Sequence, residues 1–134
     1  MARRYVLDAS AGIAILNHTS SGVALAAFRF RPGAETWTVE HFHVEVAKVI
    51  RRDVLRGDLT DTQAGQLVTG LVRWPLNVAR VAPLISDAWT MRHTITIHDG
   101  LYVALARHIG ATLVTADRKL AKAPGMDVPV IAPS

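Results

Sequence analysis

Short apolar runs separate longer segments with helical periodicity, and this alternation constrains the fold more than any other feature of the sequence. The runs at 5–7 (YVL) and 111–115 (ATLVT) lack polar alternation, which is typical of strands covered on both faces. The segments 40–56 and 99–109 instead repeat apolar residues at helical spacing. Strands that alternate with helices predict βαβ units and a mainly parallel sheet, so the expected class is α/β.

The expected elements follow from this periodicity and from the turn residues between them. Gly57 and Gly110 end two of the helices, and Thr60 with Gln63 has the spacing of a capping box. We expect strands at 4–8, 35–39, 76–81, 111–115 and 128–131, and helices at 10–16, 22–30, 40–56, 60–74, 83–93 and 99–109, with a short last helix opened by Asp117.

The length and composition favour a soluble, cytoplasmic protein of one domain. The 134 residues fit a single domain spanning 1–134. No apolar stretch approaches the roughly 20 residues that a transmembrane helix needs, and Asp8 interrupts the apolar run behind Arg3 and Arg4. We therefore expect neither a membrane span nor a signal peptide. Cysteine is absent, which excludes disulfides and thiolate metal sites.

The chain is basic, with a formal net charge of +4 and twelve arginines against three lysines. Arginine suits bidentate phosphate contacts, so the charge points to a polyanion or to an acidic protein segment as partner. A compositional bias of a GC-rich genome explains the same numbers, and the charge alone does not separate the two.

Four of the eleven acidic residues stand in unusually apolar surroundings. Asp8 follows YVL, and Glu45 lies between two valines of a predicted helix. Asp99 opens the apolar segment DGLYVALA, and Asp117 follows TLVTA. A carboxylate on or beside a buried stripe costs free energy unless it is paired or bound to a cation.

The expected topology brings these four acids toward one place. Asp8 and Asp117 follow strands, and ligands of open α/β sheets bind outside the carboxyl ends of the strands, where the strand order reverses. Glu45 and Asp99 lie on the flanking helices. We therefore expect all four carboxylates to converge in one crevice.

Each acid also has an ordinary structural explanation. Asp8, Asp99 and Asp117 have the residue type preferred at helix N-caps. Glu45 has Lys48 and Arg52 nearby on its helix as possible partners. Capping and metal binding are compatible at the same residue, and four independent structural explanations are harder to accept than one shared site.

A cluster of four carboxylates predicts divalent metal chemistry. Carboxylates that gather raise one another's pKa values, and hard cations such as Mg²⁺ or Mn²⁺ resolve the repulsion. Such metals lower the pKa of a water and stabilise a leaving oxygen in phosphodiester hydrolysis. An acidic centre in a basic chain therefore indicates a metal-dependent nuclease.

The segments YVLDAS, HFHVEVAKVIRR, HDGLYVALARHIGATLVTADRKL and VPVI, in this order, resemble the PIN domain and, within it, the VapC toxins of toxin–antitoxin pairs. The resemblance covers essentially the whole chain and is most specific from Asp99 to Leu120. It implies a PIN-like fold, with a mainly parallel sheet sandwiched by helices, and an endoribonuclease activity on RNA.

The same resemblance implies roles and partners. The acids at Asp8, Glu45, Asp99 and Asp117 match the family's Mg²⁺- or Mn²⁺-binding and catalytic positions. Ser10 and Thr115 match hydroxyl positions that support the site. The family also implies a homodimer and a VapB-like antitoxin whose C-terminal segment wraps the toxin. Two features depart from the family pattern: the segment TWTVEHF lacks a proline before the helix of Glu45, and His98 precedes Asp99.

Three other functions are weighed against this one. A zinc site built from His41, His43, His93 and His98 is disfavoured, because residues two apart do not share a helix face; exposed histidines, or histidines lining an RNA groove, are preferred. An aspartyl phosphatase needs a second aspartate where Ser10 stands. A catalytically silent PIN-like module that binds RNA or protein would normally lose one of the four acids.

Two sets of residues are candidates for RNA contacts. Trp37, Trp74, Trp89 and Tyr102 are able to stack on bases, although packing roles are preferred for them. Arg118 follows Asp117 and is the candidate phosphate contact, and Arg51 and Arg52 are considered with it. Solvated helix ends explain these cations equally simply.

Overall fold

The computed structural model describes residues 3–18, 22 and 33–133. The helix expected at 22–30 lies outside these residues, apart from Gly22.

The described strands form a five-stranded parallel sheet with the order β3-β2-β1-β4-β5. Its central strand β1 pairs Val6 with Trp37 of β2 on one side and with Leu113 of β4 on the other. The parallel α/β architecture predicted from the sequence is thus confirmed. The strands are β1 (Arg3–Leu7), β2 (Ala34–Val39), β3 (Asn77–Ala79), β4 (Thr112–Val114) and β5 (Val130–Ile131).

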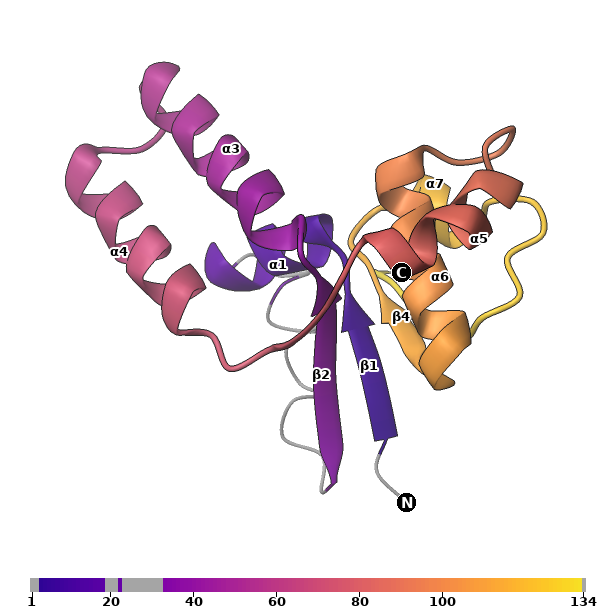
Figure 1. The fold of residues 1–134 in the computed structure, drawn as a ribbon. Coiled ribbons are helices and arrows are strands. Elements are labelled where there is room, and N and C mark those ends of the chain that lie inside the picture. The colour runs from indigo at the N-terminus through magenta and orange to yellow at the C-terminus, as the bar shows by residue number, and fades with distance from the viewer. Residues whose placement is uncertain (1–2, 19–21, 23–32, 134) are drawn as a thin grey trace.

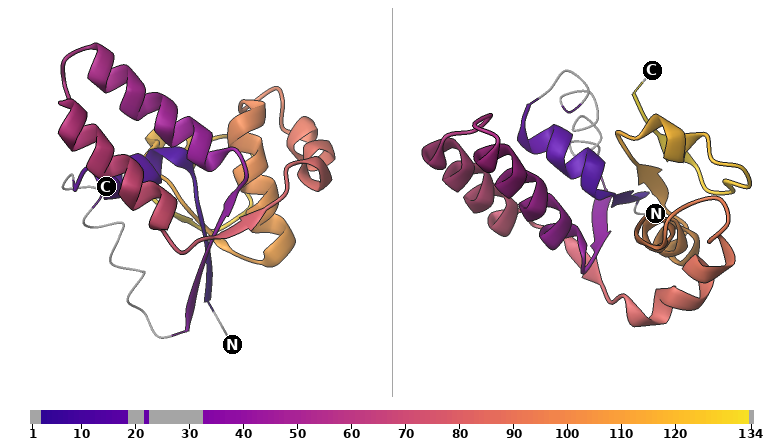
Figure 2. Two further views of the ribbon diagram at one scale, coloured as in Figure 1. Left: turned by 60° about the vertical axis from the view of Figure 1, so that its left-hand side comes forward. Right: turned by 90° about the horizontal axis from the view of Figure 1, so that it is seen from above.

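Helices cover both faces of this sheet, as Figures 1 and 2 show. On one side lie α1 (Ala9–Leu16), α3 (Phe42–Leu55) and α4 (Asp61–Arg73), and on the other lie α5 (Ile85–Thr90) and α6 (Ile97–Ile109). The 3₁₀ helix η2 (Ala82–Leu84) precedes α5, and the short α7 (Arg118–Ala121) follows β4.

The packing of two of the long helices follows directly from the sequence pattern. In α3 the stripe Phe42, Val46 and Ile50 is buried, at the i, i+4, i+8 spacing of one helix face. In α6 every residue from Gly100 to Ala106 is buried, as expected for a helix that is apolar on all sides. The capping box of Thr60 and Gln63 forms at the start of α4 as predicted.

Two helix predictions need correction. The segment 83–93 is not one helix, because η2 leads into an α5 that ends at Thr90. The helix expected to open at Asp99 begins at Ile97, with Thr96 as its N-cap. Asp99 is therefore the third residue of α6 and does not cap it.

The strand order fixes where a site can form. From β1 the chain adds β2 and then β3 toward one edge of the sheet, and it later adds β4 and β5 toward the other edge. The direction in which strands are added therefore reverses between β1 and β4. Asp8 directly follows β1, and Thr115 directly follows β4. The carboxyl ends of these two strands therefore form the crevice where ligands of such sheets bind. None of the helices in the described part of the chain is both long and apolar enough to cross a membrane.

Candidate functional site

Asp8 is a buried carboxylate at the carboxyl end of β1, with a relative exposure of 2%. It is the N-cap of α1, and its Oδ1 accepts hydrogen bonds from the Ala11 amide at 2.9 Å and the Ser10 hydroxyl at 2.7 Å. Its Oδ2 accepts a short hydrogen bond from the Thr115 hydroxyl. Helix capping explains the hydrogen bond from the Ala11 amide, but it does not explain the hydrogen bonds from the Ser10 and Thr115 hydroxyls.

The two hydroxyls join the ends of β1 and β4. Ser10 Oγ lies 3.2 Å from Thr115 Oγ1 and accepts the Ala116 amide at 2.9 Å. Thr115 Oγ1 accepts the Asp117 amide at 3.0 Å. The loop after β4, which carries Asp117, is therefore held directly against the Asp8 carboxylate.

The environment of Asp8 favours its protonated form. Burial raises its pKa from 3.8 to about 6, against the opposing effect of the hydrogen bonds from Thr115, Ala11 and Ser10. The negative charge of Asp99 adds to the increase. Asp8 and Asp99 therefore lie within electrostatic reach of each other, although they are 91 positions apart in the sequence.

Glu45 is held by two side chains that the sequence did not single out for this role. Its Oε1 accepts a hydrogen bond from the Tyr102 hydroxyl at 3.1 Å and contacts His41 Nε2 at 3.0 Å. Burial raises the pKa of Glu45, but the hydrogen bond and charge of His41 and the bond from Tyr102 outweigh it, so the pKa is lowered overall. These contacts take the place of the pairing with Lys48 or Arg52 that the sequence also allowed.

His41 is a packed side chain, which corrects the expectation of an exposed histidine. Its side chain is 14% exposed, and its ring stacks against Tyr102 and His98 with centroid distances of 4.6 and 5.3 Å. Both neighbours of Nε2, Glu45 Oε1 and the His98 carbonyl at 3.3 Å, are acceptors. Nε2 therefore carries the proton, and the buried Nδ1 has no partner among the described residues.

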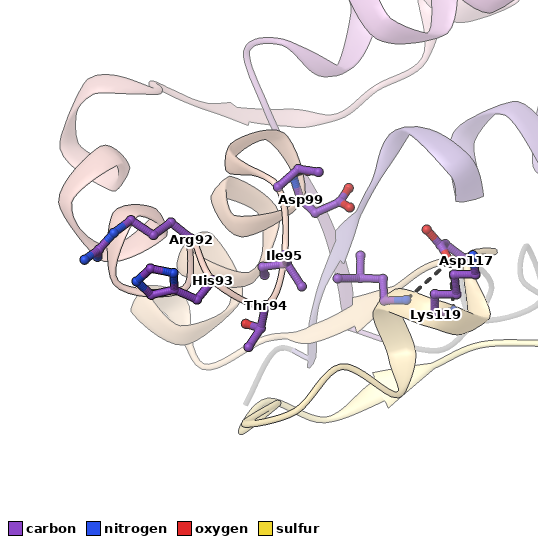
Figure 3. A pocket seen from close by; sticks show the side chains of 9 residues that line it. Arg92, His93, Thr94, Ile95, Asp99, Asp117 and Lys119 are labelled. Carbon is purple, nitrogen blue, oxygen red and sulfur yellow. Dashed lines mark hydrogen bonds between the residues drawn. The ribbon is translucent and has the colours of Figure 1, made fainter.

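Asp99 and Asp117 face each other from α6 and from the start of α7, and Figure 3 shows their carboxylates turned toward one another. Asp117 caps α7 as expected, with Oδ1 accepting the amides of Lys119 and Leu120 at 2.9 and 3.3 Å. Burial raises the pKa of Asp99, a hydrogen bond with Thr96 opposes the increase, and the charges of Asp117 and Glu45 add to it.

The electrostatic influences join all four acids into one group. Asp99 is the common neighbour, because its charge acts on Asp8 while Asp117 and Glu45 act on it. Tyr102 lies among them: burial raises its pKa, and the charges of Glu45, Asp8 and Asp99 raise it further. The structure thus brings the four predicted acids, Ser10 and Thr115 to one edge of the sheet.

An open pocket of about 430 Å³ adjoins this acidic group. Asp99 and Asp117 line it at one end, and Arg92 and His93 lie at the other end in Figure 3. The remaining lining residues are Thr94, Ile95, Thr96, Lys119 and Leu120. Arg118, the cation predicted to contact substrate, is not among them; its neighbour Lys119 is.

The oxygen atoms of the four carboxylates are ligands that suit a hard divalent cation, although the side chains do not converge on one point. Over residues 3–18 and 33–133, no three His, Asp or Glu side chains are arranged to ligate a common ion. Glu45 and Asp117 each use one carboxylate oxygen for hydrogen bonds that fix its orientation, and the described residues donate none to the second oxygen. Four carboxylates that are linked electrostatically through Asp99 fit Mg²⁺ or Mn²⁺ in ligand type.

The sequence did not identify Tyr102 and His41 as the partners of Glu45, and it did not single out the pocket residue Arg92. His93, expected to be exposed or to line an RNA groove, is exposed and lines the pocket. A local signal existed for the two partners of Glu45, because His41 is i−4 to Glu45 and Tyr102 is i+3 to Asp99, which places each on the same helix face as an acid. The meeting of Tyr102 with Glu45 is tertiary, across 57 positions, and no local pattern encodes it.

Fold and site together define an α/β protein with an acidic centre at the switch point of a parallel sheet. The family model "PIN domain" matches residues 5–126. The chain is 36% identical over 120 residues to Ribonuclease VapC12 of Mycobacterium tuberculosis, covering 90% of this chain and 92% of that protein.

Solved structures show the same architecture. The crystal structure of PAE2754 from Pyrobaculum aerophilum superposes with a TM-score of 0.70 at 23% identity, covering 97% of this chain and 84% of the other. VapBC2 from Rickettsia felis, crystallised with a DNA fragment from its promoter, gives a TM-score of 0.67 at 17% identity and covers 98% and 99%. The chain belongs to the PIN domain family, and its relatives include VapC ribonucleases.

Proposed function

We propose that this protein is a metal-dependent endoribonuclease and the toxin of a VapBC-type pair. The observation that carries the proposal is the gathering of Asp8, Glu45, Asp99 and Asp117 at the carboxyl ends of β1 and β4. The charges of Asp117 and Glu45 raise the pKa of Asp99, and the charge of Asp99 raises the pKa of Asp8. Such repulsion between carboxylates opposes folding, and a shared cation would offset it. The name of the relative VapC12 supports RNA as the substrate.

In this proposal the four carboxylates hold Mg²⁺ or Mn²⁺. When bound, such an ion lowers the pKa of a water and neutralises charge on the phosphodiester. The free oxygens of Glu45 and Asp117, together with the carboxylates of Asp8 and Asp99, are the ligands available from this chain. We expect Asp8, with its pKa near 6 in the apo protein, to be held ionised by the cation.

The other residues of the site orient these ligands. Ser10 and Thr115 fix both oxygens of Asp8, and His41 and Tyr102 fix Oε1 of Glu45. The Tyr102 hydroxyl remains a donor at neutral pH, because burial and the surrounding carboxylates raise its pKa. A ligand whose orientation is set before the ion arrives loses less conformational entropy on binding.

A catalytically silent PIN module is the alternative. The retention of all four acids favours the nuclease, since a binding module has no need to keep a repelling cluster. Binding without cleavage would identify the silent module.

The test is cleavage of a structured RNA by the wild type and by Asp99→Asn. We expect cleavage that EDTA abolishes and that Mn²⁺ or Mg²⁺ restores, and a loss of at least about a hundredfold in Asp99→Asn, because removing one preorganised electrostatic group costs this much in other enzymes. Asp58→Asn is the matched control, since Asp58 is an exposed acid in the turn after α3. Full activity in Asp99→Asn, with folding confirmed by circular dichroism, would refute the assignment.

We further propose that the protein is a cytoplasmic homodimer held inactive by a VapB-like antitoxin. Solved VapBC complexes with the same fold support the antitoxin. Exposed apolar side chains such as Val44 and Val72 support a protein interface. Co-expression with the product of a small adjacent reading frame, followed by mass measurement on a sizing column, tests both partners; a monomer with no bound chain would contradict them.

A further inference from the structure

Four aromatic residues were candidates for stacking on bases, and the structure leaves only one of them with a large accessible surface. Tyr102 is buried at 1% exposure. Trp74 packs edge-on against Phe42, and Trp37 donates its indole N–H to Glu35. Trp89 on α5, in contrast, is 56% exposed.

Trp89 is connected to the pocket beside the acids through Arg92. The Arg92 Cζ lies 4.8 Å from the centroid of the Trp89 ring, and its Nη1 donates to the Trp89 carbonyl at 3.0 Å. Arg92 also lines the pocket whose other end is formed by Asp99 and Asp117. Arg92 thus contacts the exposed Trp89 ring and also lines the pocket that Asp99 and Asp117 line.

The chemistry of this surface suits a single-stranded polyanion. The pocket lining contains the cations Arg92 and Lys119, with His93 and two threonines that are able to bind phosphate and sugar oxygens. Its volume of about 430 Å³ is within the range of pockets that hold small organic molecules. Proteins that bind single strands combine cations along a groove with aromatic rings on which bases stack. Here the cations Arg92 and Lys119 share the pocket with Asp99 and Asp117, the two carboxylates proposed to bind the metal.

We propose that Trp89, Arg92 and Lys119 form the binding track for single-stranded RNA on one side of the scissile phosphate. Arg92 and Lys119 contact backbone phosphates, and a base stacks on Trp89. The inference rests on the proposed nuclease function and adds the form of the substrate and the residues that hold it. A protein partner is disfavoured here, since the core of a protein interface is depleted in charge, whereas this lining carries the cations Arg92 and Lys119 and the carboxylates Asp99 and Asp117.

The test measures RNA binding separately from cleavage. Affinity for a short fluorescent single-stranded RNA is measured by anisotropy at several salt concentrations, in an Asp99→Asn background that prevents turnover. We expect Trp89→Ala to weaken binding by about five- to a hundredfold, the effect of losing one stacked base, with the salt dependence unchanged. Trp89→Phe, which keeps an aromatic ring, should retain most of the affinity.

The cations should behave differently from the tryptophan. Arg92→Ala and Lys119→Ala should each reduce the slope of log affinity against log salt by about 0.7, the value for one phosphate contact on a single strand. Arg56→Ala is the charge-matched control, because Arg56 is the exposed C-cap of α3, at the opposite end of that helix from Glu45, and it should leave both affinity and slope unchanged.

The outcomes separate this inference from the proposed function. Trp89→Ala with RNA affinity within twofold of its parent overturns the track, and a simultaneous change in molecular mass would identify Trp89 as a protein contact instead. If the wild type cleaves RNA but Trp89→Ala binds RNA with normal affinity, the binding track is refuted and the nuclease function stands. If the wild type binds RNA through Trp89 but shows no metal-dependent cleavage, the nuclease function is refuted and the binding track stands.

Discussion

At the scale of single residues, the site consists of carboxylates whose orientation depends on contacts with neighbouring residues that are not themselves acidic. Asp8 has both oxygens engaged by hydroxyls and an amide, and Glu45 has one oxygen engaged by His41 and Tyr102. The acids themselves were recognisable in the sequence because charge is rare inside apolar runs. The resemblance to the family indicated Ser10 and Thr115 as supporting residues, but the partners of Glu45, His41 and Tyr102, were not recognisable because tyrosine and histidine fit a packed helix equally well.

The buried Asp8 gives a stability prediction with a definite sign. Its pKa in the folded protein is about 6, against an ordinary value of 3.8, so its favourable contribution is present below pH ~3.8 and is lost as the pH rises through about 6. In EDTA, we expect the free energy of unfolding of the wild type to fall by up to ~3 kcal/mol relative to that of Asp8→Asn between pH 4 and pH 8, at ~1.36 kcal/mol per pKa unit. Urea unfolding of both proteins across this range measures the difference; parallel profiles would contradict it.

The hydrogen bond from Tyr102 to Glu45 gives a second prediction at this scale. Tyr102→Phe keeps the ring and removes only the donor, so Oε1 of Glu45 loses one of its two orienting contacts. We expect Mn²⁺ affinity to fall about tenfold, as for other partners that orient metal ligands, while the melting temperature in EDTA stays near that of wild type. Calorimetric titration with Mn²⁺ gives the affinity, and an unchanged dissociation constant would remove the positioning role from Tyr102.

At the scale of elements, the helices carry the acids into place through close packing. α1, which is capped by Asp8, lies against α3, which carries Glu45. Gly12 permits this approach: a Cβ there would lie 2.5 Å from ring carbons of Phe42. The distance between the two acids therefore depends on a small residue one turn into α1.

This contact predicts opposite effects for two glycine substitutions. Gly12→Ala should destabilise the protein by about 1–3 kcal/mol, because overpacking against Phe42 exceeds the gain in helix propensity. Gly65→Ala on α4 has no atom within 4 Å of the added Cβ, so it should stabilise by up to ~1 kcal/mol. Chemical denaturation tests the pair, and a Gly12→Ala protein as stable as Gly65→Ala would contradict the proposed packing.

Elements with a strong periodic signal were predictable from the sequence, and elements set by tertiary contact were not. α3, α4 and α6 follow from apolar spacing and caps, and the parallel sheet follows from strands without polar alternation. The segment 83–93 has no comparable stripe, and it forms a 3₁₀ turn and a short helix that pack on α6. The pocket escaped prediction for the same reason, since it lies between the 92–96 turn and α7, which only the fold brings together.

At the scale of the whole molecule, charge is distributed unevenly in a way that suits a nucleic acid. The chain has a net charge of +4, yet Asp8, Glu45, Asp99 and Asp117 gather at the switch point of the sheet. A cation bound there would reduce the local negative charge, which favours the approach of a phosphodiester to Arg92 and Lys119 in the adjoining pocket. Substrate binding and metal binding are therefore expected to reinforce each other.

The central claim, that four acids distant in sequence form one site for a divalent ion, has a direct test. Mn²⁺ binding is measured by electron paramagnetic resonance for wild type, for Asp8→Asn, Glu45→Gln, Asp99→Asn and Asp117→Asn, and for the control Asp58→Asn. We predict at least about a tenfold loss of affinity in each of the four and no change in the control. Wild-type affinity in any of the four folded variants would contradict the claim.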